Sequence, residues 1–143
     1  MIGTAPRTSP RMCEGESDMN RMRTRVMVAD DQPQVRSALL LLLRQDPEMA
    51  VVGEAGDVEQ ALQLAAEQQP DLVLLDWELP GQINGSTLSR LRATHPGLKV
   101  IALSGRPEAR LAALSAGVDA FVSKGDPPEQ LLAAVHSCKR RAH

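Results

Sequence analysis

Short apolar runs and longer amphipathic segments alternate along most of the chain. From Arg25 onward, five apolar runs are each followed by a stretch whose apolar positions have helical spacing. The third to fifth runs are apolar at nearly every position, which is typical of parallel strands buried on both faces. The pattern predicts an α/β domain of five βα units, a doubly wound parallel sheet between two layers of helices. The expected strands are 25–29, 49–55, 71–75, 99–103 and 120–123, and the expected helices are 34–45, 58–68, 87–94, 107–115 and 128–140.

Capping residues support these helix boundaries. Asp57 is expected to cap the second helix and Ser86 the third, because short polar side chains accept hydrogen bonds from free backbone N–H groups. Pro107 and the pair Pro127-Pro128 are placed where the fourth and fifth helices begin, a position that tolerates proline. The predicted helix starts therefore agree with local backbone chemistry.

The first helix contains an uninterrupted apolar run over residues 38–43. A rotation of 100° per residue places Leu40 and Leu41 away from the sheet. We expect these two leucines to be exposed and to form a partner surface, either for a second copy of this chain or for another protein. The residues expected to face the sheet are Val35, Ala38, Leu39, Leu42 and Leu43.

The 143 residues suffice for one domain with a single hydrophobic core. Residues 1–24 lack apolar periodicity and are expected to be a disordered N-terminal tail, with the folded domain spanning 25–143. The basic run at the C-terminal end is interpreted as a solvated helix end. The sequence is equally consistent with a stand-alone single-domain protein and with a fragment of a longer one.

Composition excludes several classes of protein. Apolar residues make up 43% and charged residues 24% of the chain, as in soluble globular proteins. With one Phe, one Trp and no Tyr, the chain lacks a platform for stacking on single-stranded nucleic acid. Only two cysteines are present, and the apolar runs are too short to span a bilayer. We therefore expect a cytoplasmic protein that binds neither membranes nor nucleic acid directly.

Charged and hydroxyl residues follow the predicted strands. Asp30 and Asp31 come after the first strand, Asp76 after the third, Ser104 after the fourth and Lys124 after the fifth. In open parallel sheets the ligand site lies beyond the carboxyl ends of the strands, so these side chains are expected to lie together. Three neighbouring carboxylates repel one another, and a hard dication with oxygen ligands relieves this repulsion. The pattern predicts a Mg²⁺ site beside a lysine and a hydroxyl suited to a phosphoryl group.

None of the three histidines lies in this predicted cluster, so the site lacks an imidazole base. They are placed in the loop after the third helix, in the last helix and at the C-terminus: His95, His136 and His143. The carboxylate of Asp76 is then the best candidate nucleophile, forming an acyl phosphate while a cation offsets the charge on the transferring oxygens.

Taken together, these motifs resemble the receiver domain of two-component response regulators, especially receivers of the helix-turn-helix output class. The resemblance covers residues 25–141 and rests on Asp30-Asp31, Asp76 in DLVLLDWELPG, Ser104 in VIALSG and Lys124 in AFVSK. It implies a flavodoxin-like fold with strand order 2-1-3-4-5, for which receivers are the standard example. Gly125 follows the lysine where the family often has proline, so no cis peptide is expected there.

The resemblance also implies a metal site and a phosphoacceptor. Asp31 would bind Mg²⁺ directly, Asp30 largely through water, and the main-chain carbonyl of Glu78 would complete the metal shell. Asp76 would accept phosphate from a phosphohistidine on a sensor kinase or a phosphotransfer protein. The chain would thus be a signalling phosphoacceptor that supports its own phosphotransfer and autodephosphorylation, and not an enzyme acting on other substrates.

A conformational switch is implied as well. Ser104 would move its hydroxyl toward the phosphoryl group, Lys124 would form an ion pair with that group, and Phe121 would rotate. The phosphorylated state would then control a partner or an output domain. Core packing remains an alternative role for Phe121, and the neighbouring Trp77 is either a partly exposed lid or a packing residue.

Two other functions remain open from the sequence. A phosphorylation-independent interaction module could use the same fold, although the intact acidic residues weigh against it. A magnesium phosphatase with an aspartyl nucleophile would need an Asp two residues after Asp76, where this chain has Glu78.

Glu78 and Arg106 each lie two residues beyond a site residue and are expected to meet over the mouth of the site. Their contact would slow the loss of phosphate.

Overall fold

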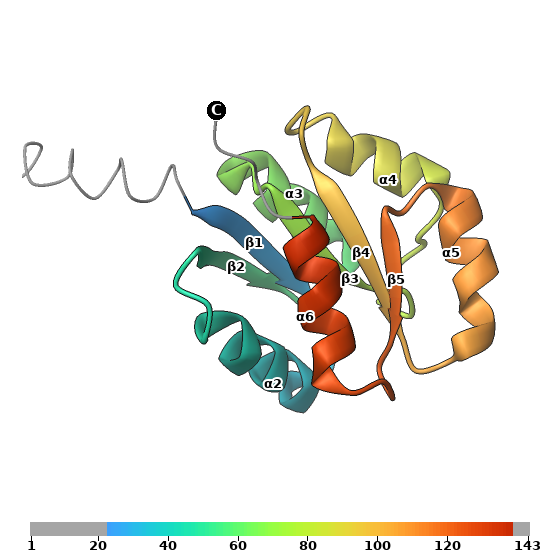
Figure 1. Ribbon diagram of the computed structural model, residues 1–143. Coiled ribbons are helices and arrows are strands. Elements are labelled where there is room, and N and C mark those ends of the chain that lie inside the picture. The colour runs from blue at the N-terminus through green and yellow to red at the C-terminus, as the bar shows by residue number, and fades with distance from the viewer. Residues whose placement is uncertain (1–22, 139–143) are drawn as a thin grey trace, which may run out of the picture.

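The computed structural model describes residues 23–138 as a three-layer α/β domain (Figure 1). Five parallel strands form one sheet in the order β2-β1-β3-β4-β5, which confirms the expected strand order and fold class. The strands are β1 (Thr24–Ala29), β2 (Met49–Ala55), β3 (Leu72–Asp76), β4 (Lys99–Ser104) and β5 (Ala120–Ser123). The helices are α2 (Pro33–Arg44), α3 (Val58–Gln68), α4 (Gly85–Arg92), the 3₁₀ turn η1 (Pro107–Ala109), α5 (Arg110–Ala116) and α6 (Pro128–Ser137).

The expected tail and the basic C-terminal run lie largely outside the described residues. Residues 1–22 and 139–143 are not described, so the proposed disorder of the tail stays a prediction. The first strand begins at Thr24, one residue before its predicted start. None of the helices within 23–138 combines the length and the apolar composition needed to cross a bilayer.

Two hydrophobic clusters fill the space on either side of the sheet. On one face, α2 and α6 cover the sheet, and Figure 1 shows these two helices side by side in front of it. On the other face, α3, α4 and α5 pack against the remaining side chains of the same strands. Val26 and Val28 of β1 belong to the first cluster, whereas Met27 and Ala29 belong to the second. This alternation follows from the period of two along a strand, and it buries both faces.

The helix starts agree in part with the predicted caps. The carboxylate of Asp57 accepts a hydrogen bond from the Gln60 N–H at 2.7 Å, and Pro128 is the first residue of α6, as predicted. The prediction of Ser86 as a cap is wrong. Asn84 caps α4 through a reciprocal pair of hydrogen bonds with Thr87, so the helix begins two residues earlier than expected. Pro107 begins the short turn η1, and α5 follows it.

The predicted orientation of α2 is wrong for Leu40. Leu40 is only 7% exposed and packs in the core with Leu43, whereas Ala38 is exposed. Leu41 is 67% exposed, as predicted. Six consecutive apolar residues leave the rotation of a helix undetermined by hydrophobicity alone, and packing against β1 and β2 selects the face.

The loop after β3 is anchored at both ends. The Trp77 N–H donates to the carbonyl of Leu103 at 2.7 Å, and Leu79 is buried in the core behind the loop. Gly81 has a φ of +111°, and a Cβ there would lie 2.7 Å from Val58 Cβ, so the loop lies close against the start of α3. Residues 76–79 are therefore held by the fold rather than left free.

Candidate functional site

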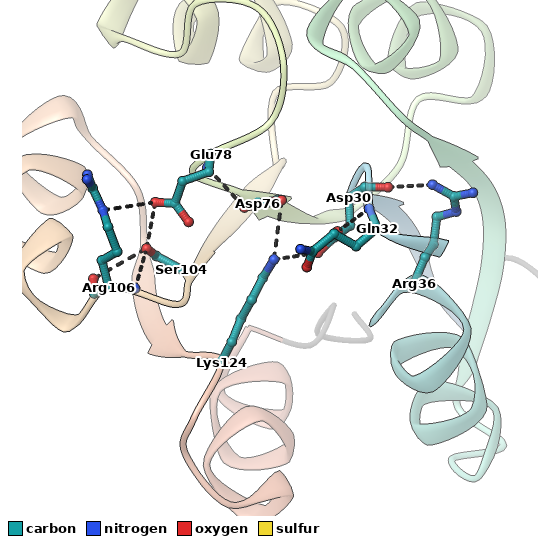
Figure 2. A network of polar contacts seen from close by, with 8 residues as sticks. All are labelled: Asp30, Gln32, Arg36, Asp76, Glu78, Ser104, Arg106 and Lys124. Atoms are coloured by element: carbon teal, nitrogen blue, oxygen red, sulfur yellow. Dashed lines mark hydrogen bonds and ion pairs between the residues drawn. The ribbon is translucent and has the colours of Figure 1, made fainter. Parts of the chain in front are cut away.

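Four adjacent strands deliver the candidate site to one edge of the sheet (Figure 2). Asp30 directly follows β1, Asp76 ends β3, Ser104 ends β4, and Lys124 directly follows β5. These strands are neighbours in the order β1-β3-β4-β5, and parallel strands end at the same edge. The structure thus brings the residues singled out in the sequence together.

Three carboxylates form the centre of this site. One oxygen from each of Asp30, Asp31 and Asp76 lies within 4.8 Å of the other two. Asp30 and Asp76 are buried, whereas Asp31 is exposed at the mouth of the site. Such a cluster of hard oxygen ligands fits a divalent cation that retains water on its open side.

Backbone groups orient the two buried carboxylates. The N–H of Gln32 donates to Oδ1 of Asp30 at 2.9 Å, and the N–H of Glu78 donates to Oδ1 of Asp76 at 2.9 Å. Each carboxylate therefore has one oxygen tied to the loop that follows it. The second oxygen of each, Oδ2, faces the ammonium group of Lys124.

Lys124 links the two buried acids. Its Nζ lies 2.9 Å from Oδ2 of Asp30 and 3.2 Å from Oδ2 of Asp76, and its side chain is only 19% exposed. The backbone N–H of Lys124 donates to the carbonyl of Ser104 at 2.8 Å, which continues the pairing of β4 and β5 beyond Ser123. The lysine is therefore held by the sheet as well as by its two ion pairs.

The environment shifts the pKa of both Asp76 and Lys124. Burial raises the pKa of Asp76 and the charge of Asp30 adds to this, while the Glu78 N–H and Lys124 act in the opposite direction without cancelling it. Burial lowers the pKa of Lys124, but the close contacts with Asp30 and Asp76 and their negative charges outweigh it, so the net shift is upward. The lysine is thus held in its charged form beside an acid whose ionised form is disfavoured.

One oxygen supports the fit of a cation to this site. Oδ2 of Asp30 is buried and receives no hydrogen bond of normal geometry within residues 23–138, although Lys124 lies near it. Lys124 is one cation shared by two buried carboxylates, so a further cation would offset the negative charge that remains. Asp30, Asp31 and Asp76 thus offer the carboxylate oxygens that a divalent cation binds, close enough together to share one ion.

Ser104 lies on the far side of Asp76 from Asp30 and joins a second polar group (Figure 2). Its hydroxyl donates to Oε2 of Glu78 at 2.7 Å and accepts from the N–H of Arg106 at 3.0 Å. The predicted contact between Glu78 and Arg106 is confirmed, with Arg106 Nε 3.8 Å from Glu78 Oε2. The hydrogen bond from Ser104 to the Glu78 side chain was not expected from the sequence.

Arg36 is a second residue that the sequence did not single out. Its guanidinium donates to the backbone carbonyl of Asp30 and forms an ion pair with Glu54 at 3.1 Å. A cation in the first turn of a helix opposes the helix dipole, and this was the available signal. Arg36 positions the backbone that carries Asp30.

The remaining candidates lie outside the carboxylate cluster. His95 pairs with Asp71 at 2.9 Å, and His136 lies 3.7 Å from Asp46, so neither imidazole reaches the site, as predicted. Phe121 and Trp77 are half-buried and both pack against the cluster on the α3, α4 and α5 side. Packing is thus part of the role of each residue.

Most of the chain is similar to known proteins. Residues 26–136 match the family model described as the response regulator receiver domain. The nitrate/nitrite response regulator protein NarL of Escherichia coli K12 is 35% identical over 119 residues, which are 82% of this chain and 55% of NarL. The DNA-binding response regulator MtrA of Mycolicibacterium smegmatis is 36% identical over 126 residues, 86% of this chain and 54% of MtrA.

Solved structures show the same fold. The signal receiver domain of the putative response regulator NarL from Mycobacterium tuberculosis superimposes with a TM-score of 0.72 at 30% identity, covering 81% of this chain and 95% of that one. A LuxR family two-component response regulator from Aurantimonas sp. SI85-9A1 gives a TM-score of 0.73 at 30% identity, covering 80% and 84%.

The chain therefore belongs to the receiver domains of two-component response regulators, a family of signalling domains. This confirms the resemblance found in the sequence. The chain spans about half the length of the curated relatives it matches.

Proposed function

We propose that this chain is a magnesium-dependent phosphoacceptor that takes a phosphoryl group on Asp76 from a phosphohistidine of a sensor kinase or phosphotransfer protein. One observation carries the proposal: the buried carboxylate of Asp76 lies beside a lysine ammonium group, 3.2 Å away, and in a cluster with two further aspartates. A carboxylate in this setting is a nucleophile with cations at hand for the charge that arrives with phosphate.

In the proposed transfer, a carboxylate oxygen of Asp76 attacks the phosphorus in line with the bond to the imidazole nitrogen of the donor. A P–O bond forms, the P–N bond breaks, and its electron pair returns to the imidazole. Lys124 moves its ion pair from the carboxylate to a phosphoryl oxygen, which requires little motion because Nζ already lies beside Asp76.

Asp30, Asp31, Asp76 and the main-chain carbonyl of Glu78 are the residues that would hold Mg²⁺. The bound ion supplies positive charge that offsets the charge on the transferring phosphoryl oxygens. The burial of Asp30 and the exposure of Asp31 leave the open side of this cluster toward solvent, where the donor approaches.

Phosphorylation is proposed to act as a switch. Ser104 would turn its hydroxyl toward the phosphoryl group, and the strand end and η1 that follow it would shift with Phe121. The chain would support the hydrolysis of its own acyl phosphate but would act on no other substrate. Its phosphorylated state would be recognised by a partner protein or an output region in the cytoplasm.

A groove beside Lys124 supports a docking place for the phosphohistidine donor. It has a volume of about 420 Å³ and lies between α2 and the start of α6. Its lining is mostly apolar and includes Ala38, Leu39 and Leu131, with Lys124 on its border. A helix of a donor protein seated there would bring a phosphohistidine to the edge of the sheet that carries Asp76.

Labelling by acetyl phosphate tests the proposed function. We expect the wild-type chain to gain one phosphoryl group in Mg²⁺, detected by intact mass, and to lose this reactivity in EDTA or after Asp76→Asn. Asp57→Asn is the matched control, because it removes a carboxylate beyond β2 while keeping a side chain that caps α3. Wild-type protein that is never labelled, or Asp76→Asn protein labelled as fast as wild type, contradicts the proposal. Either result would favour an interaction module that does not depend on phosphate.

A further inference from the structure

The hydroxyl of Ser104 is already engaged on the side of the site away from Lys124. Ser104 has no exposed surface, and its Oγ donates to Oε2 of Glu78 at 2.7 Å while accepting from the Arg106 N–H at 3.0 Å. A hydrogen bond to a carboxylate is shorter and about twice as strong as one between neutral groups. The side chain of Glu78 is therefore the dominant partner of this hydroxyl.

A serine hydroxyl has a single proton to donate. In the structure the hydroxyl donates it in a hydrogen bond to Glu78, or to the more distant carbonyl of Arg106 at 3.3 Å. Donation to a phosphoryl group on Asp76 requires the same proton. The two arrangements exclude each other, so Glu78 competes directly with the phosphoryl group for Ser104.

The fold keeps Glu78 in position for this competition. Its N–H is bound by Oδ1 of Asp76 at 2.9 Å, and the next residue, Leu79, is buried in the core. The Glu78 side chain is 38% exposed, and its carboxylate points toward Ser104 and Arg106 (Figure 2). Arg106 is 65% exposed and its Nε is 3.8 Å away, so solvent screens most of that ion pair. The bond from Ser104 is the contact that orients the carboxylate.

We propose that Glu78 is a positioning residue that holds the Ser104 hydroxyl in the unphosphorylated arrangement and must release it before the switch is completed. The inference rests on the proposed function at Asp76 and adds that a hydrogen bond to Glu78 must break before Ser104 can bind the phosphoryl group. Release of Ser104 lowers the affinity of the site for a phosphoryl group by the strength of the bond that is broken. The side chain of Glu78 thus sets the threshold of the switch, separately from the proposed role of its main-chain carbonyl.

A double-mutant cycle with beryllofluoride, a mimic of the phosphoryl group, tests this inference. Binding is measured at saturating Mg²⁺ through the fluorescence of Trp77, the single tryptophan in the sequence. Glu78→Gln keeps the size of the side chain but weakens the bond from Ser104, and we expect about tenfold tighter binding. Glu78→Ala removes the acceptor and is expected to tighten binding at least as much. In a Ser104→Ala background both effects should fall to within about twofold, because no hydroxyl remains to be released.

The cycle separates release of Ser104 from simple charge repulsion. If Glu78 acted only by repelling an anion, Glu78→Gln would tighten binding equally in both backgrounds, and the inference would be overturned. Beryllofluoride binding that is no tighter in Glu78→Gln and Glu78→Ala than in wild type would also overturn the inference. Glu108→Gln, a loss of charge at an exposed site in η1, is the matched control and should leave binding unchanged. Thermal melts of each variant establish that it is folded.

The outcomes also separate this inference from the proposed function. Wild-type protein that binds no beryllofluoride in Mg²⁺, or Asp76→Asn protein that binds it as tightly as wild type, contradicts both. Wild-type binding that depends on Asp76 but shows no coupling between Glu78 and Ser104 contradicts only the release of Ser104 by Glu78.

Discussion

The ammonium nitrogen of Lys124 lies 2.9 Å from Oδ2 of Asp30, a residue without exposed surface. This ion pair joins the ends of β1 and β5, with β3 and β4 between them in the sheet. Lys124 also reaches Asp76, so one cation serves two buried acids. The site is consequently under strong electrostatic restraint before any ligand arrives.

Replacement of Lys124 by Met should destabilise the protein in the absence of divalent cations. Two buried carboxylates would lose their cation, and removing one partner of a buried ion pair costs about 3–5 kcal/mol. We expect about 3 kcal/mol, because the lysine retains some exposure. Mg²⁺ should restore most of the loss. Urea unfolding with and without Mg²⁺ measures this, and Lys99→Met, at an exposed position, is the control. Equal loss in both variants would contradict the prediction.

Asp76→Asn should raise the stability of the metal-free protein at neutral pH. Burial and the charge of Asp30 raise the pKa of Asp76 in the folded state, so the folded protein holds a proton there more tightly than the unfolded chain. The free energy of unfolding of the wild type therefore falls as pH rises from the pKa of Asp76 in the unfolded chain through its higher pKa in the folded protein. Asparagine does not ionise, so the variant keeps the stability that the wild type loses over this pH range.

Thermal melts in EDTA across the acidic to neutral range check this sign. The variant should melt a few degrees above wild type at pH 7, and the difference should close as pH falls below the raised pKa. Mg²⁺ should reduce the difference in melting temperature or make the wild type the more stable protein, because the wild type has the full set of carboxylate ligands. A variant that melts below wild type in EDTA at pH 7 would show that burial of the charged Asp76 carries no cost.

Asp31→Asn should weaken Mg²⁺ binding without unfolding the domain. Asp31 is exposed, so the substitution leaves the core intact, but it removes a negative ligand from the cluster. We expect at least a tenfold loss of affinity in a titration followed by Trp77 fluorescence. Glu108→Gln removes a charge at an exposed position outside the cluster and should bind Mg²⁺ as wild type does. An affinity within twofold of wild type would remove Asp31 from the metal site.

Ala38→Arg should slow phosphotransfer from a phosphohistidine protein while leaving labelling by acetyl phosphate unchanged. Ala38 is exposed in the groove between α2 and α6, where a long charged side chain would block a docked helix. We expect at least a tenfold slower transfer, as when a central interface residue is lost. Ala66→Arg on α3, on the opposite face of the sheet, is the control. Equal slowing with both phosphodonors would place the defect at Asp76 rather than in docking.

Helix boundaries were predicted correctly where they depend on interactions within a single helix turn. Asp57 caps α3 and Pro128 begins α6, because each depends on the backbone of its own helix turn. The cap of α4 was misplaced, since Ser86 and Asn84 both have suitable side chains and only the loop conformation selects Asn84. Leu40 was misplaced because an unbroken apolar run does not reveal which side of the helix meets the sheet.

The sequence by itself determined the βα order, the apolar strands and the presence of acids, a hydroxyl and a lysine at the strand ends, because periodicity and position along the chain are one-dimensional properties. Tertiary structure alone decided that Asp30, Asp76 and Lys124 lie within ion-pair distance and that the Ser104 hydroxyl donates a hydrogen bond to Glu78. These contacts join residues from separate strands. Sheet packing and loop conformation set their distances, and neither is encoded in any single segment.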